Sequence, residues 1–224
     1  EPLFMRRQAG EVLPYIEWAV NNRYMSRGRS HLQFHASTVT WRGRGVAFAA
    51  SSGSGKSTLA ATLLAGGWRY LCDEFALIDR RTRLLQPFPK AICIKEGSFE
   101  VVRSLGLPLL AREHFAKAYK GRVGYVSPHQ VRTDAVGVPV PLRMVVFPRY
   151  TGTPTPTLRP MHRAEALMQL STMSFNRGLF GGESMELMTE VMAGARCYRL
   201  EAGDVQRTRR VLEEAVLDEA AAAA

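Results

Sequence analysis

The residues with the clearest chemistry form a glycine-rich segment at residues 50–57, which has the sequence ASSGSGKS. This segment matches the phosphate-binding-loop pattern, with alanine in place of the first glycine. Small residues let backbone N–H groups surround phosphate oxygens, and the following helix N-terminus adds partial positive charge. Lys56 is expected to reach the β and γ phosphates of a nucleotide, Ser57 to bind Mg²⁺, and Thr58 to bond the α phosphate. The predicted nucleotide-binding residues are Ser52, Gly53, Ser54, Gly55, Lys56, Ser57 and Thr58.

Two acidic residues, Asp73 and Glu74, follow this loop at a short distance along the chain. The intervening residues are enough for one helix, one turn and one strand, so the acids are expected at the end of a strand beside the loop. One carboxylate there can hold Mg²⁺ while the other accepts a proton from an attacking hydroxyl. An acidic pair in a solvated turn is the alternative that spacing alone leaves open.

These motifs together resemble the catalytic domain of the HPr kinase/phosphorylase family. The resemblance rests on His35-Ala36, on the SGSGKS loop and on the segment GWRYLCDE at residues 67–74. It is strongest over residues 31–80 and implies an α/β (α+β) P-loop domain similar to phosphoenolpyruvate carboxykinase, with one main sheet and flanking helices. We expect a single domain over residues 1–219, with residues 1–30 as an N-terminal segment and residues 31–80 as the nucleotide-binding core.

The resemblance also implies an activity and a role for each matched residue. The protein would be an ATP- and Mg²⁺-dependent kinase that transfers the γ-phosphoryl group to a hydroxyl, that of a serine in a peptide or small protein. Asp73 would accept the proton, His35 would orient Asp73, and Glu74 would assist the metal site together with Asp73 and Ser57. The resembled family forms closed rings, which implies a homo-oligomer. Its later glutamate-arginine-glycine signature, which is tied to the reverse reaction, phosphorolysis, is absent from this sequence, so the resemblance leaves open whether that reaction occurs.

Three further basic residues, Lys90, Lys95 and Arg122, are candidates for clamping phosphate oxygens. A phosphoryl-transfer transition state spreads negative charge over several oxygens and is stabilised by additional cations. Each of these residues is alternatively an ordinary surface charge.

The elements that position these residues follow from periodicity and punctuation. We predict helices at residues 11–25, 56–65, 98–105, 108–120, 161–170 and 183–193, and a final helix capped by Asp204. We predict strands at residues 31–40, 45–50, 68–72, 75–78, 142–148 and 196–200, and turns or loops at residues 42–45, 79–83 and 151–157. Residues 121–126 are loop-like or extended, and residues 174–178 form either a lid or an ordinary turn.

Composition limits the remaining function classes. The 224 residues are 46% hydrophobic and 22% charged, which is typical of a globular chain, and no apolar run is long enough to span a membrane. Three scattered cysteines favour a reducing compartment, so we expect a cytoplasmic protein. The chain begins with Glu1 rather than Met, which suggests a processed protein or a fragment, and the alanines at residues 220–224 are not expected to function.

The net charge of +10 invites a nucleic-acid interpretation, but arginine carries most of it and is scattered along the chain. An anionic nucleotide explains the basic excess better than nucleic acid does. Two alternatives to a peptide kinase stay open: a small-molecule kinase on the same scaffold, and a nucleotide-gated assembly protein that hydrolyses ATP slowly.

Overall fold

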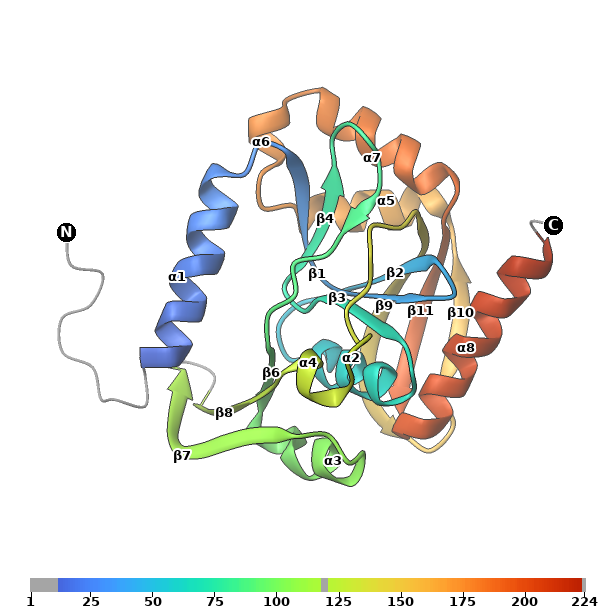
Figure 1. Cartoon of the computed structure of the whole chain (residues 1–224). Helices are drawn as coiled ribbons and strands as arrows, with labels where there is room; N and C mark the ends of the chain where they lie inside the picture. Colours follow the sequence, from blue (N-terminus) through green and yellow to red (C-terminus); the bar gives the residue numbers. More distant parts are fainter. Residues whose placement is uncertain (1–11, 118–120, 223–224) are drawn as a thin grey trace, which may run out of the picture.

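A mixed sheet forms the centre of the computed structural model, which describes residues 12–117 and 121–222 (Figure 1). The strands lie in the order β10, β11, β9, β2, β1, β4, β5, and β3 pairs with β1 off this path. They are β1 (His31–Trp41), β2 (Arg44–Ala49), β3 (Arg69–Cys72), β4 (Phe75–Asp79), β5 (Leu85–Gln86), β9 (Leu142–Thr153), β10 (Thr157–Met161) and β11 (Arg196–Gly203). Strand β9 pairs in parallel with β2 and β11, and the other pairs are antiparallel.

Helices cover both faces of this sheet (Figure 1). One face buries Val39 and Phe48 against α2 and α8, and the opposite face buries Phe34 and Ala47 against α5 and α7. The helices are α1 (Val12–Arg27), α2 (Lys56–Ala65), α3 (Phe99–Ser104), α4 (Pro128–Val131), α5 (Arg163–Thr172), α6 (Arg177–Phe180), α7 (Glu183–Ala193) and α8 (Val205–Ala222), with the short 3₁₀ helix η2 (Glu96–Ser98). The predicted α/β architecture with one main sheet and flanking helices is therefore confirmed.

A second, three-stranded sheet packs against α2 from the side. It contains β6 (Ile92–Lys95), β8 (Gly121–Val126) and β7 (Leu109–Lys117), in that order. Its buried side chains share a core with Leu64 of α2 and Val102 of α3. This sheet places the end of β6 and the start of η2 beside the N-terminus of α2.

Strand β1 is the element that brings the two predicted motifs together. On one side it pairs with β2, whose end at Ala49 lies opposite Ala36. On the other side it pairs with β3 up to Cys72, opposite Thr38, and with β4 from Phe75, opposite His35. The gap between β3 and β4 holds Asp73 and Glu74. Because neighbouring strands lie about 5 Å apart, the glycine-rich loop and the acidic pair end up on either side of the same short stretch of β1.

Most of the predicted elements are confirmed. Helix α2 has the predicted bounds, and the turn after β1 has positive φ at Arg42 and Gly43, as a two-residue hairpin turn requires. Asp204 accepts a hydrogen bond from the backbone N–H of Arg207 at 2.8 Å and so caps α8 as expected. In the segment at residues 174–178, Phe175 and Asn176 form a bend and Arg177 begins α6, and the Asn176 side chain bonds three backbone groups of the segment at residues 28–33.

Three details of the prediction are wrong. Residues 109–117 form strand β7 instead of a helix, because β8 provides a pairing edge that outweighs local propensity. Strand β9 continues to Thr153, into the predicted loop, because β11 pairs alongside it. The Ser98 side chain makes no capping bond at the start of α3. Residues 118–120, the end of the predicted helix, lie outside the described residues.

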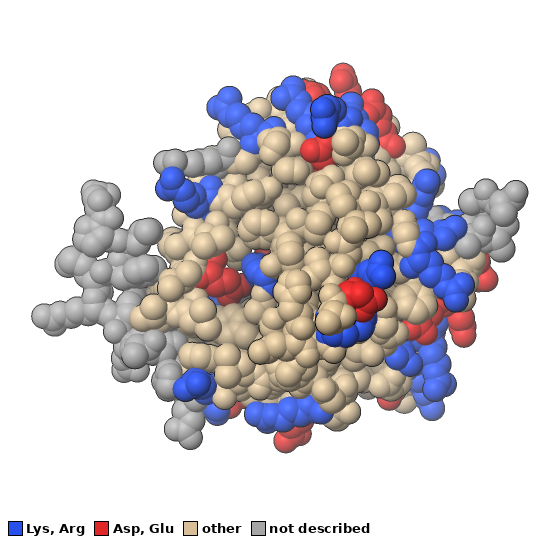
Figure 2. Space-filling view, in the orientation of Figure 1, with Lys and Arg blue, Asp and Glu red and all other residues tan. Residues whose placement is uncertain are grey.

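The surface and the helices bear on two further expectations. On the face shown in Figure 2, the described Lys and Arg side chains lie mainly near the edge of the molecule, interspersed with acids, and form no continuous basic surface. Several arginines are paired with carboxylates, among them Arg83 with Glu190 and Arg132 with Asp134. Among the described helices, none is both long and apolar enough to cross a membrane.

Candidate functional site

The glycine-rich loop joins the end of β2 to the start of α2. Gly53 and Gly55 have φ values of 95° and 92°, in the left-handed region that glycine adopts without strain. Gly55 is the N-cap of α2, and no side chain caps this helix start. The first backbone N–H groups of α2 therefore face the loop without a side-chain acceptor, which is the arrangement that binds anions at helix N-termini.

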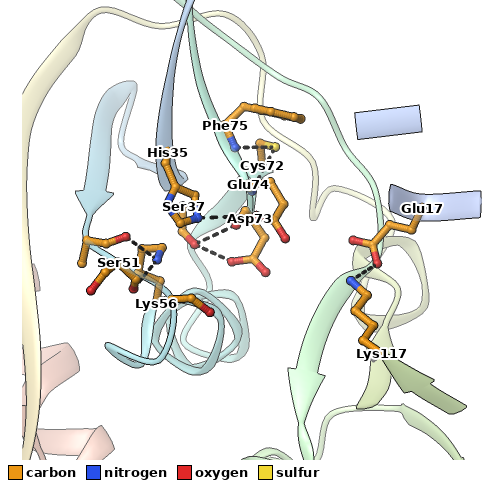
Figure 3. A network of polar contacts seen from close by, with 12 residues as sticks. Glu17, His35, Ser37, Ser51, Lys56, Cys72, Asp73, Glu74, Phe75 and Lys117 are labelled. Atoms are coloured by element: carbon orange, nitrogen blue, oxygen red, sulfur yellow. Dashed lines mark hydrogen bonds and ion pairs between the residues drawn. The ribbon is translucent and has the colours of Figure 1, made fainter. Parts of the chain in front are cut away.

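Lys56 lies inside this loop. Its ammonium donates hydrogen bonds to the backbone carbonyls of Ala50 at 2.6 Å and Ser51 at 2.9 Å (Figure 3). The residue is only 6% exposed, so its positive charge is held within the loop. A phosphate bound by the loop would compete for the same ammonium hydrogens as these two neutral carbonyls.

Asp73 is a buried carboxylate at the break between β3 and β4, and it is only 3% exposed. The hydroxyl of Ser37 on β1 donates to its Oδ1 in a short hydrogen bond, and Ser57 of α2 also bonds its side chain. In Figure 3 the carboxylate of Asp73 points toward the N-terminal end of α2. Burial and the nearby charge of Glu74 together raise the pKa of Asp73 to about 6, although the charge of Lys90 and the hydrogen bonds from Ser37 and Ser57 oppose this rise.

Glu74 and His35 form a second pair beside Asp73. The Nε2 atom of His35 lies 3.6 Å from Oε2 of Glu74, and the His35 ring also packs against Phe175. His35 was expected to orient Asp73, but in the structure Ser37 does this and His35 contacts Glu74. The alternation of side chains along β1 explains the pairing, because His35 and Ser37 lie on the same face of the strand, two residues apart.

The loop and the acidic pair line one cavity of about 110 Å³. Its lining includes most of the predicted residues: His35, Ser52, Gly53, Gly55, Lys56, Ser57, Thr58, Asp73, Glu74 and Lys95. Of the predicted loop residues, Ser54 lines a neighbouring hollow instead. The fold therefore brings residues that are up to sixty positions apart in the sequence into one cavity. One phosphoryl group would fit in this cavity.

The three predicted phosphate clamps have different positions. The ammonium of Lys95 lies in the cavity, 3.5 Å from the hydroxyl of Ser52. Lys90 is paired instead with Glu17 at 2.5 Å, and Arg122 with Glu96 at 2.5 Å. Lys95 is thus placed where a phosphate clamp would have to be. Lys90 and Arg122 instead pair with the carboxylates of Glu17 and Glu96.

Two contacts at the site were missed in the sequence. Ser37 follows His35 by two residues, and this spacing in a strand was the available signal. Thr58, expected to bond a phosphate, donates to the Ser98 hydroxyl at 2.8 Å, so η2 is tied to the start of α2. Ser98 also lines the cavity, and only the pairing of the second sheet brings it there.

A second hollow, of about 180 Å³, lies on the other side of the loop. It shares Gly53, Gly55 and Thr58 with the first cavity, and the ends of β9 and β11 complete it. Tyr150, whose side chain is 63% exposed, stands at its edge. A nucleotide with its phosphates in the loop would have space here for its sugar and base.

Comparison with protein-family models finds a similarity over the first half of the chain. A family model described as ScmC, a SynChlorMet cassette protein, matches residues 8–107. This range includes the loop, β1 and the acidic pair, and it covers less than half of the chain. A comparison with curated proteins found no match.

The raised pKa of Asp73 predicts an unusual effect on stability. The folded state holds the proton of Asp73 more tightly than the unfolded chain, in which the pKa is about 3.8. This contribution to stability is present at pH 4 and is lost as the pH rises through 6. We therefore compare the free energy of unfolding of Asp73→Asn with that of the parent, both metal-free, at each pH. The difference should favour the variant more at pH 8 than at pH 4, by up to about 3 kcal/mol in urea unfolding.

Asp79→Asn is the matched control, because its hydrogen bonds with Thr82 and Arg81 lower the pKa of Asp79. That substitution should destabilise the protein at pH 8. If the stability of Asp73→Asn and of the parent protein depends on pH in the same way, the pKa of the buried Asp73 carboxyl is not raised.

Proposed function

We propose that this protein is an ATP-dependent kinase that transfers the γ-phosphoryl group of ATP to a serine hydroxyl of a peptide or small protein. The observation that carries the proposal is the buried carboxylate of Asp73, held by two serines in the same cavity as Lys56. The resemblance of residues 31–80 to the HPr kinase family supports both the serine acceptor and a P-loop fold of that type. The match to the ScmC family model names neither an activity nor a substrate.

The proposed transfer uses groups that already face the cavity. The acceptor hydroxyl gives its proton to Asp73, and its oxygen attacks the γ phosphorus. The bond from the γ phosphorus to the bridging oxygen breaks, and ADP leaves with the electron pair. A base with a pKa near 6 is largely ionised at neutral pH and still accepts a proton effectively.

The loop and Lys56 stabilise charge during this transfer. Backbone N–H groups at the start of α2 and the ammonium of Lys56 donate hydrogen bonds to the phosphate oxygens. For Lys56, these bonds replace the ones to the carbonyls of Ala50 and Ser51. Lys95, whose ammonium lies 3.5 Å from the Ser52 hydroxyl, adds a further cation from the end of β6. These groups are in place before the substrate binds, so little reorganisation is needed at the moment of reaction.

Ser57, Glu74 and Asp73 fit a Mg²⁺ ion. The described residues contain no group of three or more His, Cys, Asp and Glu side chains arranged for a metal, but nucleotide-bound Mg²⁺ takes most of its ligands from phosphates and water. When bound, Mg²⁺ neutralises charge on the phosphates. The hydroxyl of Ser57, now bonded to Asp73, would be a ligand together with the Glu74 carboxylate.

Cytoplasmic location and self-association belong to the same proposal. The three cysteines are all free and buried, which supports a reducing compartment. A homo-oligomer is expected from the resemblance alone.

Asp73→Asn tests the base. We expect this variant to lose at least 100-fold in phosphoryl transfer, because the amide cannot accept the proton, while ATP affinity changes less than threefold. Transfer is measured with γ-labelled ATP and a serine peptide library, and ATP affinity by calorimetry with a non-hydrolysable ATP analogue and Mg²⁺. Asp134→Asn, at an exposed position in an ion pair with Arg132, is the control and should be fully active. Transfer by Asp73→Asn at the parental rate would refute the assigned base.

Lys56→Ala tests the loop. We expect ATP affinity to fall at least tenfold, since no other ammonium lies within the loop between β2 and α2. Arg122→Ala is the matched control, because it also removes one positive charge but from an exposed pair with Glu96. If both variants bind ATP like the parent, the nucleotide site lies elsewhere.

The same assay distinguishes the remaining alternatives. Label transferred to a panel of small alcohols and sugars, with none on peptides, identifies a small-molecule kinase. Slow release of free phosphate with no labelled acceptor identifies a nucleotide-gated assembly protein. The peptide-kinase proposal requires label on serine, located by mass spectrometry.

A further inference from the structure

Helix α1 exposes large apolar side chains on two sides, with Leu13, Ile16 and Val20 on one side and Trp18 on the other. Val12, Leu13, Ile16, Trp18 and Val20 are each between 42% and 50% exposed. In Figure 1 the helix stands at one side of the molecule, next to the end of the small sheet. An ordinary surface helix buries one apolar side and exposes a polar one, so α1 has more apolar surface than its own packing uses.

The position of α1 is set by a buried charge cluster. Glu17 pairs with Lys117 of β7 at 2.6 Å and with Lys90 at 2.5 Å, and its side chain is 11% exposed (Figure 3). Burial would raise the pKa of Glu17, but the two ammonium groups outweigh this and lower it. Removing either side of such a buried cluster would be strongly destabilising, so these pairs fix the helix against the small sheet.

Between α1 and the proposed transfer site lies a pocket of about 480 Å³. Tyr15, Trp18 and Met25 line it from α1. Phe75 and Phe175 line it from the opposite side. We call this space the α1 pocket.

The α1 pocket is continuous with the phosphate cavity. His35, Ser52 and Glu74 line both spaces. A group seated in the α1 pocket therefore approaches the γ-phosphate position from the side of the acidic pair. That is the side from which an acceptor hydroxyl must come if Asp73 takes its proton.

The chemistry of the lining selects the kind of acceptor. The polar lining residues His35, Ser52 and Glu74 lie where the pocket meets the phosphate cavity, and Lys117 is already paired with Glu17. A sugar or another polyhydroxylated molecule needs a hydrogen-bond partner for each buried hydroxyl, and the aromatic rings and the thioether that line the rest of the pocket provide few. A large apolar side chain, in contrast, gains free energy from leaving water in such a pocket. The volume is within the range of small-ligand sites and suits one large side chain with adjoining backbone.

One polar group in the lining also suits a peptide. The Oδ1 atom of Asn21 is buried and has no hydrogen-bond partner within the described part of the chain. Asn21 lines the α1 pocket and is 8% exposed. If the Asn21 amide turns toward the pocket, a backbone N–H of a bound peptide supplies the missing donor.

We propose that the α1 pocket binds the acceptor peptide by a large apolar or aromatic side chain close in sequence to the phosphorylated serine. The inference rests on the proposed kinase function and specifies its substrate: a peptide with an apolar residue near the serine, not a sugar or a charged metabolite. Trp18 is the residue that makes this contact.

The test is a positional scan of capped heptapeptides with a central serine, each other position being varied in turn, with γ-labelled ATP and Mg²⁺. We expect Phe, Trp, Leu or Met to be selected at one position and Asp, Glu and Lys to be rejected there. For the best peptide, Trp18→Ala should raise KM at least tenfold and leave KM for ATP within twofold. Trp18→Phe should restore most of the affinity, because an aromatic ring is kept.

Val20→Ala is the matched control. Val20 is as exposed as Trp18 on the same helix, but it lines a different hollow on the far side of α1. Its substitution should leave peptide KM unchanged, and since both residues are exposed, both variants should fold.

The outcomes separate the two levels of the proposal. Serine phosphorylation with a flat residue preference, equal in the parent and Trp18→Ala, overturns the pocket assignment and leaves the kinase function standing. Label on small alcohols or sugars and on no peptide overturns both. A peptide KM that rises equally in Trp18→Ala and Val20→Ala also overturns the assignment, because the effect is then not specific to the pocket.

Discussion

The site depends on one buried carboxylate. Asp73 is nearly inaccessible to water, lies beside a second acid, and is held by the hydroxyls of Ser37 and Ser57. Such a group destabilises a fold at neutral pH, so its presence in the core is a local conflict that function explains better than stability does. The interruption between β3 and β4 exists around this residue: Cys72 ends one strand, Phe75 begins the next, and β1 runs continuously past both.

Strand β1 is the scaffold on which the remaining parts are assembled. On one side β2 leads into the glycine-rich loop, and on the other side the acidic pair lies between β3 and β4. His35 and Ser37 of β1 itself contact the two acids. Helix α2 adds Lys56 and Ser57, and the small sheet adds Lys95 and Ser98. Helix α1, fixed by Glu17, closes the other side and carries the apolar pocket. The proposed phosphate site and the proposed acceptor site thus belong to different elements that meet at Glu74.

The loop and the acidic pair could be predicted from the sequence because each has a local signal. The residues around them could not be predicted, because contacts between distant parts of the chain bring them to the site. The loop has a fixed spacing with a known backbone requirement, so Lys56 and Ser57 were found directly, and α2 has the expected bounds. The acids were found because one helix and one strand separate them from the loop. Ser37, Ser98 and Trp18 were not found, since a serine in a strand or a tryptophan in a helix has no signal of its own. Strand β7 was mistaken for a helix because its pairing with β8 is a tertiary contact, and Lys90 was taken as a phosphate clamp because its partner Glu17 is distant in sequence.

The most direct measurement is a crystal structure with a non-hydrolysable ATP analogue and Mg²⁺. We predict that the γ phosphate lies in the cavity between Lys56 and Asp73. The Lys56 ammonium should then bond phosphate oxygens in place of the carbonyls of Ala50 and Ser51. The carboxylate of Glu74 should face the metal. A nucleotide bound with its terminal phosphate directed away from Asp73, or bound elsewhere on the molecule, would contradict this prediction.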